Sequence, residues 1–332
     1  MPESALTLQG PLVVRSPNWL GDAVMAMPAV SNLKAIVGED PLTVAAPEKL
    51  AALWRRCPFV DDVIALEKPK NLRATARQLR AGQFGSTMLL PNSLRAALEA
   101  WLAGIPQRLG YARGGRGFLL THSLPAPPRN PVRLHQSLYY LDLVAGFGGP
   151  GDFSAPEMRI DPVAATDPDE LILAICPGAE YGPAKRWPVK NFATVARHFM
   201  TTLNARIVLL GAAVDVPVAE EFVQQLPEVE NLVGKTSLDE FMAALVSARL
   251  VLCNDSGAMH VASVLGVPTL AIFGSTEPRM TGPIGERSRA LRHHVPCSPC
   301  FLRDCPIDFA CMRSITPQMV VAEAEEMLRA YP

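Results

Sequence analysis

The chain has 332 residues, enough for two domains of ordinary size, and 49% of its residues are hydrophobic, so each domain can bury a core. Its 31 basic and 32 acidic residues leave a formal charge of -1, which argues against a general nucleic-acid binder because such proteins are usually basic. The N-terminus lacks the basic and apolar regions of a signal peptide, and no run of eighteen apolar residues predicts a membrane span. We therefore expect a cytoplasmic protein.

Short apolar runs alternate with helical patterns along the whole chain. In the first half, the predicted strands are residues 12–15, 42–46, 63–66 and 87–90, and the predicted helices are 29–37, 72–80 and 94–103. In the second half, the predicted strands are 172–176, 206–210, 250–253 and 269–273, and the predicted helices are 192–203, 219–226, 238–247, 259–265 and 318–329. Such alternation predicts an α/β protein with parallel sheets covered by helices on both faces.

A segment rich in Gly, Pro and Asp, residues 146–169, predicts a linker between two domains. We expect an N-terminal doubly wound domain over residues 1–160 and a C-terminal one over residues 161–315. Residues 316–332 are expected to form a helix that packs back on the N-terminal domain. A ligand would then lie at the carboxyl ends of the strands, in the cleft between the two domains.

Two common nucleotide-binding motifs are absent. The turn after the first predicted strand reads RSPNWLGDAV, with one Gly, whereas a dinucleotide-binding turn needs G-x-G-x-x-G. The stretch GKTS at residues 234–237 resembles the end of a P-loop, but Val229 stands where the first Gly of that loop is required. The pattern therefore argues against a dehydrogenase and against a P-loop kinase or ATPase.

The turn SPNWLGDAV carries the first candidate site. Asp22 follows Gly21 directly after a strand, where a helix should begin, and Asn18 and Trp19 lie in the same turn. A carboxylate at a helix N-terminus is often only a partner of the helix dipole. The neighbouring Trp19 favours a binding role instead, since an exposed Trp in a loop is unusual unless it packs or binds.

The stretch CPGAEYGPAKRWPVKNF follows the strand that opens the second half. Pro188 suits the first turn of a helix, so Lys185 precedes a helix N-terminus, where its charge opposes the helix dipole. An anion bound at this position would make the interaction of the Lys185 charge with the helix dipole favourable overall. A Lys together with backbone N–H groups commonly binds phosphate. The alternative is a solvated basic turn.

The stretch CNDSGAMHVAS joins an apolar strand to a helical pattern. Asp255 and Ser256 are typical helix-capping residues, and the N–H groups of Ser256 and Gly257 could also hold a phosphate. His260 lies in the first turn of the predicted helix, where it is more often a structural residue than a catalytic one. Two anion-binding helix starts in one half and a carboxylate in the other indicate a phosphorylated donor and a general base.

Taken together, these stretches resemble a known family. NWLGDAVMAMPAV, LPNSLRAAL, AGIPQRLGY, CPGAEYGPAKRWP, NDSGAMHVA and ITPQMVV are similar to motifs of the bacterial ADP-heptose–lipopolysaccharide heptosyltransferases, in the same order and over essentially the whole chain. LPNS together with PGAEYGPAKRWP is most similar to the second heptosyltransferase. The resemblance implies a GT-B fold, in which two Rossmann-like domains face each other across a cleft.

The resemblance also implies an activity and its residues. The reaction would be an inverting transfer of L-glycero-D-manno-heptose from its ADP donor to the first heptose of the lipopolysaccharide inner core, with no cofactor required. Asp22 would be the general base, and Lys185 would neutralise the donor diphosphate. The implied donor-site residues are Glu180, Tyr181, Lys185, Thr236, Asp255, Ser256, Gly257 and His260. The enzyme would contact the inner face of the inner membrane peripherally.

A basic segment is the candidate acceptor site. Between residues 95 and 133 the chain carries Arg95, Arg108, Arg113, Arg116, Arg129 and Arg133, with Glu99 as the only acid. A solvated basic face is the common explanation. A phosphorylated glycolipid acceptor at an anionic membrane would also use such a patch. We predict that Arg113 and Arg116 contact the heptosyl-Kdo-lipid A acceptor, together with Asn18 and Trp19.

Four cysteines lie within fifteen residues in CSPCFLRDCPIDFAC. Cys297 and Cys300 have the C-x-x-C spacing of metal ligands, and Cys305 and Cys311 complete a set of four. The spacing of the second pair is irregular, so reduced structural thiols are favoured over a metal or a disulfide.

Other activities also fit the pattern. The acceptor could be that of heptosyltransferase I or III. The same scaffold could instead serve a nucleotide-sugar epimerase, or a protein that binds a nucleotide sugar without catalysis.

Overall fold

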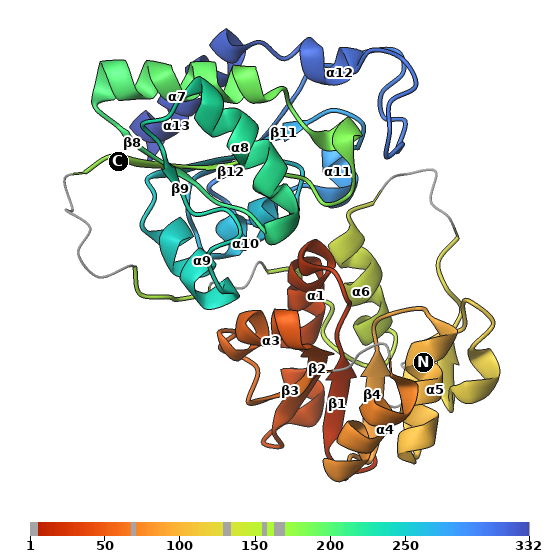
Figure 1. The fold of residues 1–332 in the computed structure, drawn as a ribbon. Helices are drawn as coiled ribbons and strands as arrows, with labels where there is room; N and C mark the ends of the chain where they lie inside the picture. The colour runs from red at the N-terminus through yellow and green to blue at the C-terminus, as the bar shows by residue number, and fades with distance from the viewer. Residues whose placement is uncertain (1–5, 68–70, 129–133, 155–157, 163–169, 332) are drawn as a thin grey trace. The chain divides into compact units, whose positions relative to one another are not determined.

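A computed structural model describes residues 6–67, 71–128, 134–154, 158–162 and 170–331 (Figure 1). The chain divides into two compact units, Met1–Met158 and Arg159–Pro332. The division falls inside the Gly-, Pro- and Asp-rich segment 146–169. Residues 155–157 and 163–169 of the predicted linker lie outside the described part of the chain.

The first unit is built on a parallel sheet with the strand order β3-β2-β1-β4-β5-β6 in the part of the chain that is described. Its strands are β1 (Leu12–Arg15), β2 (Leu42–Pro47), β3 (Asp62–Leu66), β4 (Ser86–Leu89), β5 (Gln107–Tyr111) and β6 (His122–Leu124). Its helices are α1 (Leu20–Asn32), α2 (Lys34–Val37), α3 (Glu48–Arg55), α4 (Leu72–Ala81), α5 (Leu94–Ala103) and α6 (Gln136–Ala145). This strand order is that of a Rossmann fold, in which the chain reverses direction across the sheet between β1 and β4.

The central strands of the first unit are buried on both faces, which explains their continuous apolar sequence. Every residue of β1, β2 and β4 is buried, as expected where helices cover both sides of a parallel sheet. Helix α1 packs against α6, and α4 packs against α5 (Figure 1). Leu89 of β4 and Ala97 of α5 belong to one apolar core cluster.

The segment Leu20–Val37 is long and apolar enough to cross a membrane by length and composition alone. It comprises α1 and α2, and 61% of it is buried inside the structure. Because α1 also packs against α6, we interpret the segment as a core helix of the first unit.

The second unit repeats the same design. Its strands are β7 (Ile172–Cys176), β8 (Arg206–Leu209), β9 (Glu230–Asn231), β10 (Leu250–Asn254), β11 (Thr269–Phe273) and β12 (Ser288–Arg292). Its helices are α7 (Val189–Leu203), α8 (Val216–Gln225), α9 (Leu238–Val246), α10 (Gly257–Val264), α11 (Pro278–Thr281), α12 (Ala310–Arg313) and α13 (Pro317–Ala330). The sheet is parallel with the order β12-β11-β10-β7-β8-β9, which is again the Rossmann order, with its reversal between β7 and β10.

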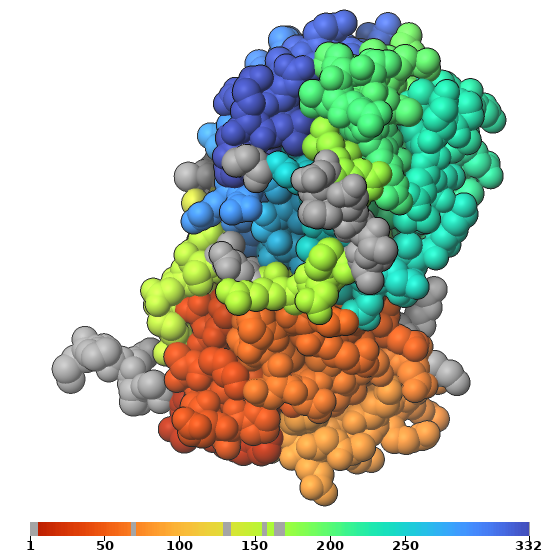
Figure 2. Space-filling view, turned by 90° about the vertical axis from the view of Figure 1, so that its left-hand side faces the viewer, coloured from red at the N-terminus to blue at the C-terminus, as the bar shows by residue number. Residues whose placement is uncertain are grey.

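The last helix, α13, packs within the second unit. Val320, Ala324 and Met327 are buried in the same core cluster as Phe192 and Phe199 of α7. Helices α7 and α13 lie side by side, and the blue C-terminal segment adjoins the green of α7 at the surface (Figure 2). The sequence led us to expect this helix on the first domain. The apolar face of α13 is instead covered by α7. Residues 316–332, which we expected to form a separate segment, are therefore part of the second unit.

The predicted elements correspond to real ones, but several elements were missed. The predicted helix at 29–37 is wrong in its start, because α1 begins at Leu20 and contains Pro28 in its interior. Sequence analysis also missed the helices α3 and α6 and the strands β5, β6, β9 and β12. The last three of these strands are edge strands or short strands that are not buried, so they lack a continuous apolar run.

Candidate functional site

Each sheet places some of its candidate residues at the point where its strand order reverses. In a doubly wound sheet, loops after the two strands at this point leave in opposite directions and open a crevice at their carboxyl ends. In the second unit these strands are β7 and β10, which pair in parallel from Leu250 opposite Leu173 to Cys253 opposite Cys176. The loop after β7 carries Lys185, and the loop after β10 carries Asp255. The topology therefore brings two distant motifs together.

Lys185 and Asp255 form a buried ion pair. The Lys185 Nζ lies 2.6 Å from the Asp255 Oδ2, and the two side chains are only 12% and 3% exposed. Thr276, in the loop after β11, donates a hydrogen bond from its Oγ1 to the same Asp255 oxygen at 2.5 Å. Asp255 thus holds the ammonium group of Lys185 in place. Its own position is fixed by Thr276.

Tyr181 completes the surroundings of Lys185. The Lys185 Nζ lies 4.8 Å from the centre of the Tyr181 ring, and the Arg303 guanidinium lies 5.4 Å from the same ring. The Tyr181 hydroxyl donates to the main-chain oxygen of Phe301 at 2.8 Å, and the Tyr181 main-chain oxygen accepts from Arg303 Nε at 2.7 Å. Two cations near one exposed ring make this loop locally positive, as an anionic ligand requires.

Asn254 and Trp187 fix the loop that carries Lys185. The Asn254 Oδ1 accepts a hydrogen bond from the main-chain N–H of Trp187 at 2.9 Å, and its Nδ2 donates to the oxygen of Pro177 at 2.7 Å. Trp187 is 1% exposed, and its indole N–H donates to the oxygen of Ile315 at 2.9 Å. The Asn254 side-chain amide thus ties both ends of the loop to β10. This holds the backbone of Lys185 in a fixed position.

The motif NDSGAMH opens α10 as the sequence predicted. Ser256 is the N-cap residue, Gly257 is the first residue of the helix, and both are partly accessible. Main-chain N–H groups at such a helix start can bind a phosphate. His260 is 3% exposed and lies in the buried face of α10. This burial is consistent with a structural role for His260.

The remaining predicted donor residues lie on the same edge of the sheet. Glu180 is exposed in the loop after β7. Thr236 follows the edge strand β9 and directly precedes Ser237, the N-cap of α9. Because β9 is two strands away from β7, Thr236 belongs to a separate loop of this edge. The structure assigns neither residue a contact with the pair formed by Lys185 and Asp255 in the described part of the chain.

Glu277 is a charged residue near this edge that sequence analysis missed, although GSTEP follows a buried strand as directly as NDSG does. It is 4% exposed and caps α11. Its Oε2 accepts from Arg292 Nη1 at 2.9 Å, and its Oε1 accepts from Arg279 Nε at 3.2 Å. Burial by itself raises the pKa of Glu277, but these hydrogen bonds outweigh it and lower the pKa to about 2.

We expect Glu277→Gln to destabilise the protein in a pH-dependent way. Folding lowers the pKa of Glu277 from 4.5 to about 2. The stability that the ionised carboxylate contributes is therefore complete above the unfolded-state pKa of 4.5, and it is lost as the pH falls through the folded-state pKa of about 2. At pH 7 the variant should lose about 1–3 kcal/mol, because Arg292 loses a charged partner. Urea unfolding at pH 7, 5, 4 and 3 measures the difference from wild type. A difference that is constant over this series contradicts the prediction.

The first unit has its reversal point between β1 and β4, and Asp22 lies beside it. Asp22 is half-buried in the first turn of α1, whose N-cap is Trp19. Burial raises the pKa of Tyr140 on α6, and the charge of Asp22 raises it further, so the two side chains are neighbours. Asp22 therefore occupies the predicted position, at a helix start on the carboxyl edge of the sheet.

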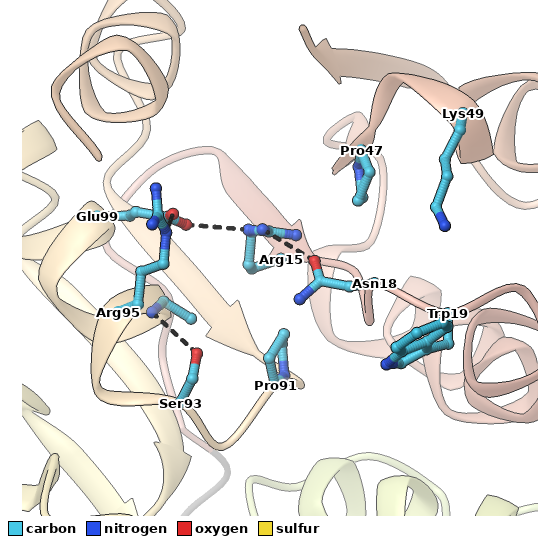
Figure 3. Close-up of a pocket in the computed structure, with 10 residues that line it drawn as sticks. Arg15, Asn18, Trp19, Pro47, Lys49, Pro91, Ser93, Arg95 and Glu99 are labelled. Carbon is cyan, nitrogen blue, oxygen red and sulfur yellow. Dashed lines mark hydrogen bonds and ion pairs between the residues drawn. The ribbon is translucent and has the colours of Figure 1, made fainter. Parts of the chain in front are cut away.

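A pocket of about 380 Å³ opens at the same edge (Figure 3). Its walls come from the ends of β1, β2 and β4 and from the starts of α3 and α5. The lining residues are Arg15, Asn18, Trp19, Pro47, Lys49, Pro91, Ser93, Arg95, Ala96 and Glu99. The predicted acceptor residues Asn18 and Trp19 are thus part of a real pocket, and Trp19 is 55% exposed. Sequence analysis missed the contributions of Arg15 and Lys49.

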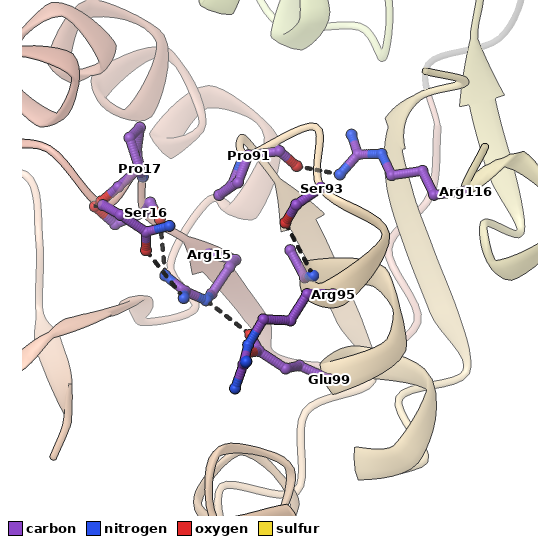
Figure 4. Close-up of polar contacts among 10 residues, drawn as sticks. Arg15, Ser16, Pro17, Pro91, Ser93, Arg95, Glu99 and Arg116 are labelled. Atoms are coloured by element: carbon purple, nitrogen blue, oxygen red, sulfur yellow. Dashed lines mark hydrogen bonds and ion pairs between the residues drawn. The ribbon is translucent and has the colours of Figure 1, made fainter. Parts of the chain in front are cut away.

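The prediction for Arg116 is wrong. The side chain is fully buried, and its guanidinium donates to the main-chain oxygens of Tyr111 and Leu89. It also donates to the main-chain oxygen of Pro91 (Figure 4). It also donates to the Asn92 Oδ1 at 3.2 Å. Arg116 therefore ties the loop after β4 to β5 and has no surface left for an acceptor.

The rest of the basic segment is divided between several roles. Arg113 is partly exposed in the loop after β5 and stays a candidate acceptor residue. Arg108 donates to the main-chain oxygens of Ile105 and Leu119 at 2.5 and 2.6 Å. Arg95 lines the pocket. Arg129 and Arg133 lie outside the described residues.

The four clustered cysteines are free thiols. Cys297 and Cys300 are exposed, Cys305 accepts a hydrogen bond from the Phe309 N–H at 3.3 Å, and Cys311 is buried. Burial raises the pKa of Cys311, although a hydrogen bond from the Met312 main chain opposes this effect. The negative charge of the other three cysteines as thiolates raises the pKa further. Within the described ranges, no group of three or more His, Cys, Asp and Glu side chains is arranged to hold a metal ion.

Three known proteins are similar to this chain. A lipooligosaccharide heptosyltransferase 2 of Haemophilus influenzae is 29% identical over 85% of this chain and 88% of that protein. The structure of E. coli ADP-heptose LPS heptosyltransferase II is 28% identical, with a TM-score of 0.83 over 96% of this chain and 99% of that one. E. coli heptosyltransferase WaaC with ADP-2-deoxy-2-fluoro heptose shares the fold, at 17% identity and a TM-score of 0.69 over 95% and 99% of the two chains.

The family follows from the sequence match and the fold together. Two parallel Rossmann sheets and the likeness to these heptosyltransferase structures give the chain the predicted α/β GT-B fold. The profile of glycosyltransferase family 9 (heptosyltransferase) matches residues 72–310, which is more than half of the chain and includes both Lys185 and Asp255. The chain therefore belongs to glycosyltransferase family 9, the heptosyltransferases, and is a glycosyltransferase.

Proposed function

We propose that the protein transfers L-glycero-D-manno-heptose, with inversion, from ADP-heptose to the first heptose of the lipopolysaccharide inner core. The observation that carries this proposal is the Lys185–Asp255 pair, held at the switch point of the second sheet. The likeness to heptosyltransferase II proteins over most of the chain supports the choice of sugar and of acceptor.

The second unit would bind the donor. When the sugar leaves, negative charge builds up on the oxygens of the diphosphate. The Lys185 ammonium is fixed by Asp255 before the donor arrives, so it needs little reorganisation to stabilise that charge. The N–H groups at the start of α10, from Ser256 and Gly257, would complete the cradle.

The first unit would bind the acceptor and activate it. Asp22 would accept the proton of the acceptor hydroxyl as that oxygen attacks the anomeric carbon of the heptose from the face opposite the diphosphate. The C–O bond to the diphosphate then breaks, and ADP leaves with the electron pair. A base in this role must lie within hydrogen-bond reach of the hydroxyl. Asn18 and Trp19 in the adjacent turn would orient the acceptor.

The place of action follows from the acceptor. Because heptosyl-Kdo-lipid A is a membrane lipid, we propose a peripheral contact with the inner face of the inner membrane. Partly exposed cations such as Arg113 would favour an anionic lipid surface.

The deciding experiment is ADP release from ADP-heptose with two acceptors, one ending in Kdo and one already carrying the first heptose. We expect turnover only with the heptose-bearing acceptor. Turnover with the Kdo acceptor would move the assignment to heptosyltransferase I. Conversion of ADP-heptose without any acceptor would indicate an epimerase. Donor binding without turnover would indicate a binding protein.

A further inference from the structure

The segment after β12 carries the clustered cysteines, and it packs against two loops at the carboxyl edge of the second sheet. The Phe301 N–H donates to the main-chain oxygen of Ser275, in the loop after β11, at 2.8 Å. The Ala184 N–H, in the loop after β7, donates to the main-chain oxygen of Arg303 at 3.0 Å. Because Ala184 directly precedes Lys185, this segment lies beside the candidate donor site.

Gly182 allows the segment to approach the loop after β7 closely. A Cβ at this position would lie 2.6 Å from the main-chain oxygen of Arg303, which is too short for a real contact. The Tyr181 hydroxyl donates to the main-chain oxygen of Phe301 at 2.8 Å, and the Arg303 Nε donates to the Tyr181 main-chain oxygen at 2.7 Å. These contacts fix the Arg303 guanidinium next to the exposed Tyr181 ring.

Lys185 alone does not give the candidate donor site a net positive charge. Its Nζ lies 2.6 Å from the Asp255 carboxylate, so the buried pair is close to neutral as a whole. Both phosphates of a nucleotide-sugar diphosphate are ionised at neutral pH, and more negative charge develops on them as the sugar leaves. A donor of this kind therefore needs a further cation.

Arg303 is placed to be this further cation. Its side chain is exposed and forms no ion pair within the ranges that the structure describes. Its guanidinium lies 5.4 Å from the centre of the Tyr181 ring, and the Lys185 Nζ lies 4.8 Å from the same centre. Of the Arg303 nitrogens, Nε alone makes a side-chain hydrogen bond to the described residues, so Nη1 and Nη2 are available for phosphate oxygens.

We propose that Arg303 binds the diphosphate of the nucleotide-sugar donor, with Nη1 and Nη2 on phosphate oxygens and Lys185 beside it. The segment that carries the cysteines thereby supplies a residue of the donor site. The identity of the donor as ADP-heptose rests on the proposed function. Recognition of a nucleoside diphosphate by Arg303 depends neither on the acceptor nor on turnover.

Calorimetric titration of the full chain with ADP and with adenosine tests the proposal without a sugar or an acceptor. Arg303→Gln removes the charge and both Nη groups, and it keeps an N–H donor as far along the side chain as Nε. This variant should bind ADP more weakly by about 10-fold or more, the effect of losing a charge-assisted hydrogen bond. Its affinity for adenosine should equal that of the wild type, because adenosine has no phosphate.

Two further variants separate the charge of Arg303 from its contact with the Tyr181 loop. Arg303→Lys keeps a positive charge and should bind ADP more tightly than Arg303→Gln does. Arg313→Gln removes an Arg whose side chain is 66% exposed in α12 of the same segment, and its affinity for ADP should equal that of the wild type. In turnover, Arg303→Gln should lower kcat/KM for ADP-heptose by a factor similar to the loss of ADP affinity and leave the KM for the acceptor unchanged.

A purely structural role for Arg303 gives different results. If Arg303 only holds the Tyr181 loop, Arg303→Lys and Arg303→Gln should bind ADP equally, or the loss should be the same for adenosine, and either result overturns the proposal. Wild-type affinity of Arg303→Gln for ADP also overturns it, and the proposed function then stands if heptose is transferred. If the loss is specific to ADP but no acceptor turns over, the proposed function fails and Arg303 remains a diphosphate-binding residue.

Discussion

Asp22→Asn should lower kcat by about 10²–10⁴-fold with the heptose-bearing acceptor, the usual contribution of a positioned general base. The substitution keeps the size of the side chain and removes its basicity. Binding of ADP-heptose should be nearly unchanged, because Asp22 lies in the first unit and the proposed donor groups Lys185 and Ser256 lie in the second. Single-turnover kinetics and calorimetric donor titration measure the two quantities separately.

A structural role for Asp22 makes a different prediction. If its carboxylate only stabilises the start of α1, the variant should lose about 0.3–1 kcal/mol of stability and keep its kcat. Asp40→Asn is a matched control, since Asp40 is an exposed carboxylate of the same unit outside the site. A kcat for Asp22→Asn that matches that of Asp40→Asn would remove Asp22 from the mechanism.

Lys185→Gln should lower kcat/KM for ADP-heptose by about 10²–10³-fold, the range found when one preorganised donor to a developing charge is removed. The same substitution leaves Asp255 as a buried carboxylate without its cation. Breaking a buried pair in this way costs about 3–5 kcal/mol, so the variant should also be less stable. Activity must therefore be measured on the folded fraction, and Lys190→Gln on the exposed face of α7 serves as the control.

A double variant separates the two effects of Lys185. Asp255→Asn combined with Lys185→Gln removes the unpaired carboxylate, and Thr276 can still donate to the new amide oxygen. We expect urea unfolding to show recovered stability, whereas kcat/KM should stay low because the Lys185 cation proposed to stabilise the diphosphate is missing. Recovery of both quantities would show that Lys185 acts only by holding the structure together.

The central strands and their motifs were predictable from the sequence. Strands such as β1 and β7 are buried on both faces, so their apolar runs are continuous and end sharply at polar turns. The turns after β1, β7 and β10 carry Asp22, Lys185 and Asp255, and each turn could be recognised as a candidate site without coordinates. Edge strands such as β12 carry Ser and Arg and could not be recognised in this way.

The contacts between distant segments were decided by the tertiary structure alone. The same residue type, Arg, lies within one basic segment at positions 95 and 116, yet Arg95 lines an open pocket and Arg116 is buried among main-chain oxygens. The sequence also could not show that Arg15 and Glu99, 84 residues apart, form a buried ion pair. The periodicity of α13 predicts an apolar face but not the helix that covers it, which is α7. Local patterns determine which groups a chain carries and on which elements, whereas burial and pairing depend on how strands are ordered across a sheet.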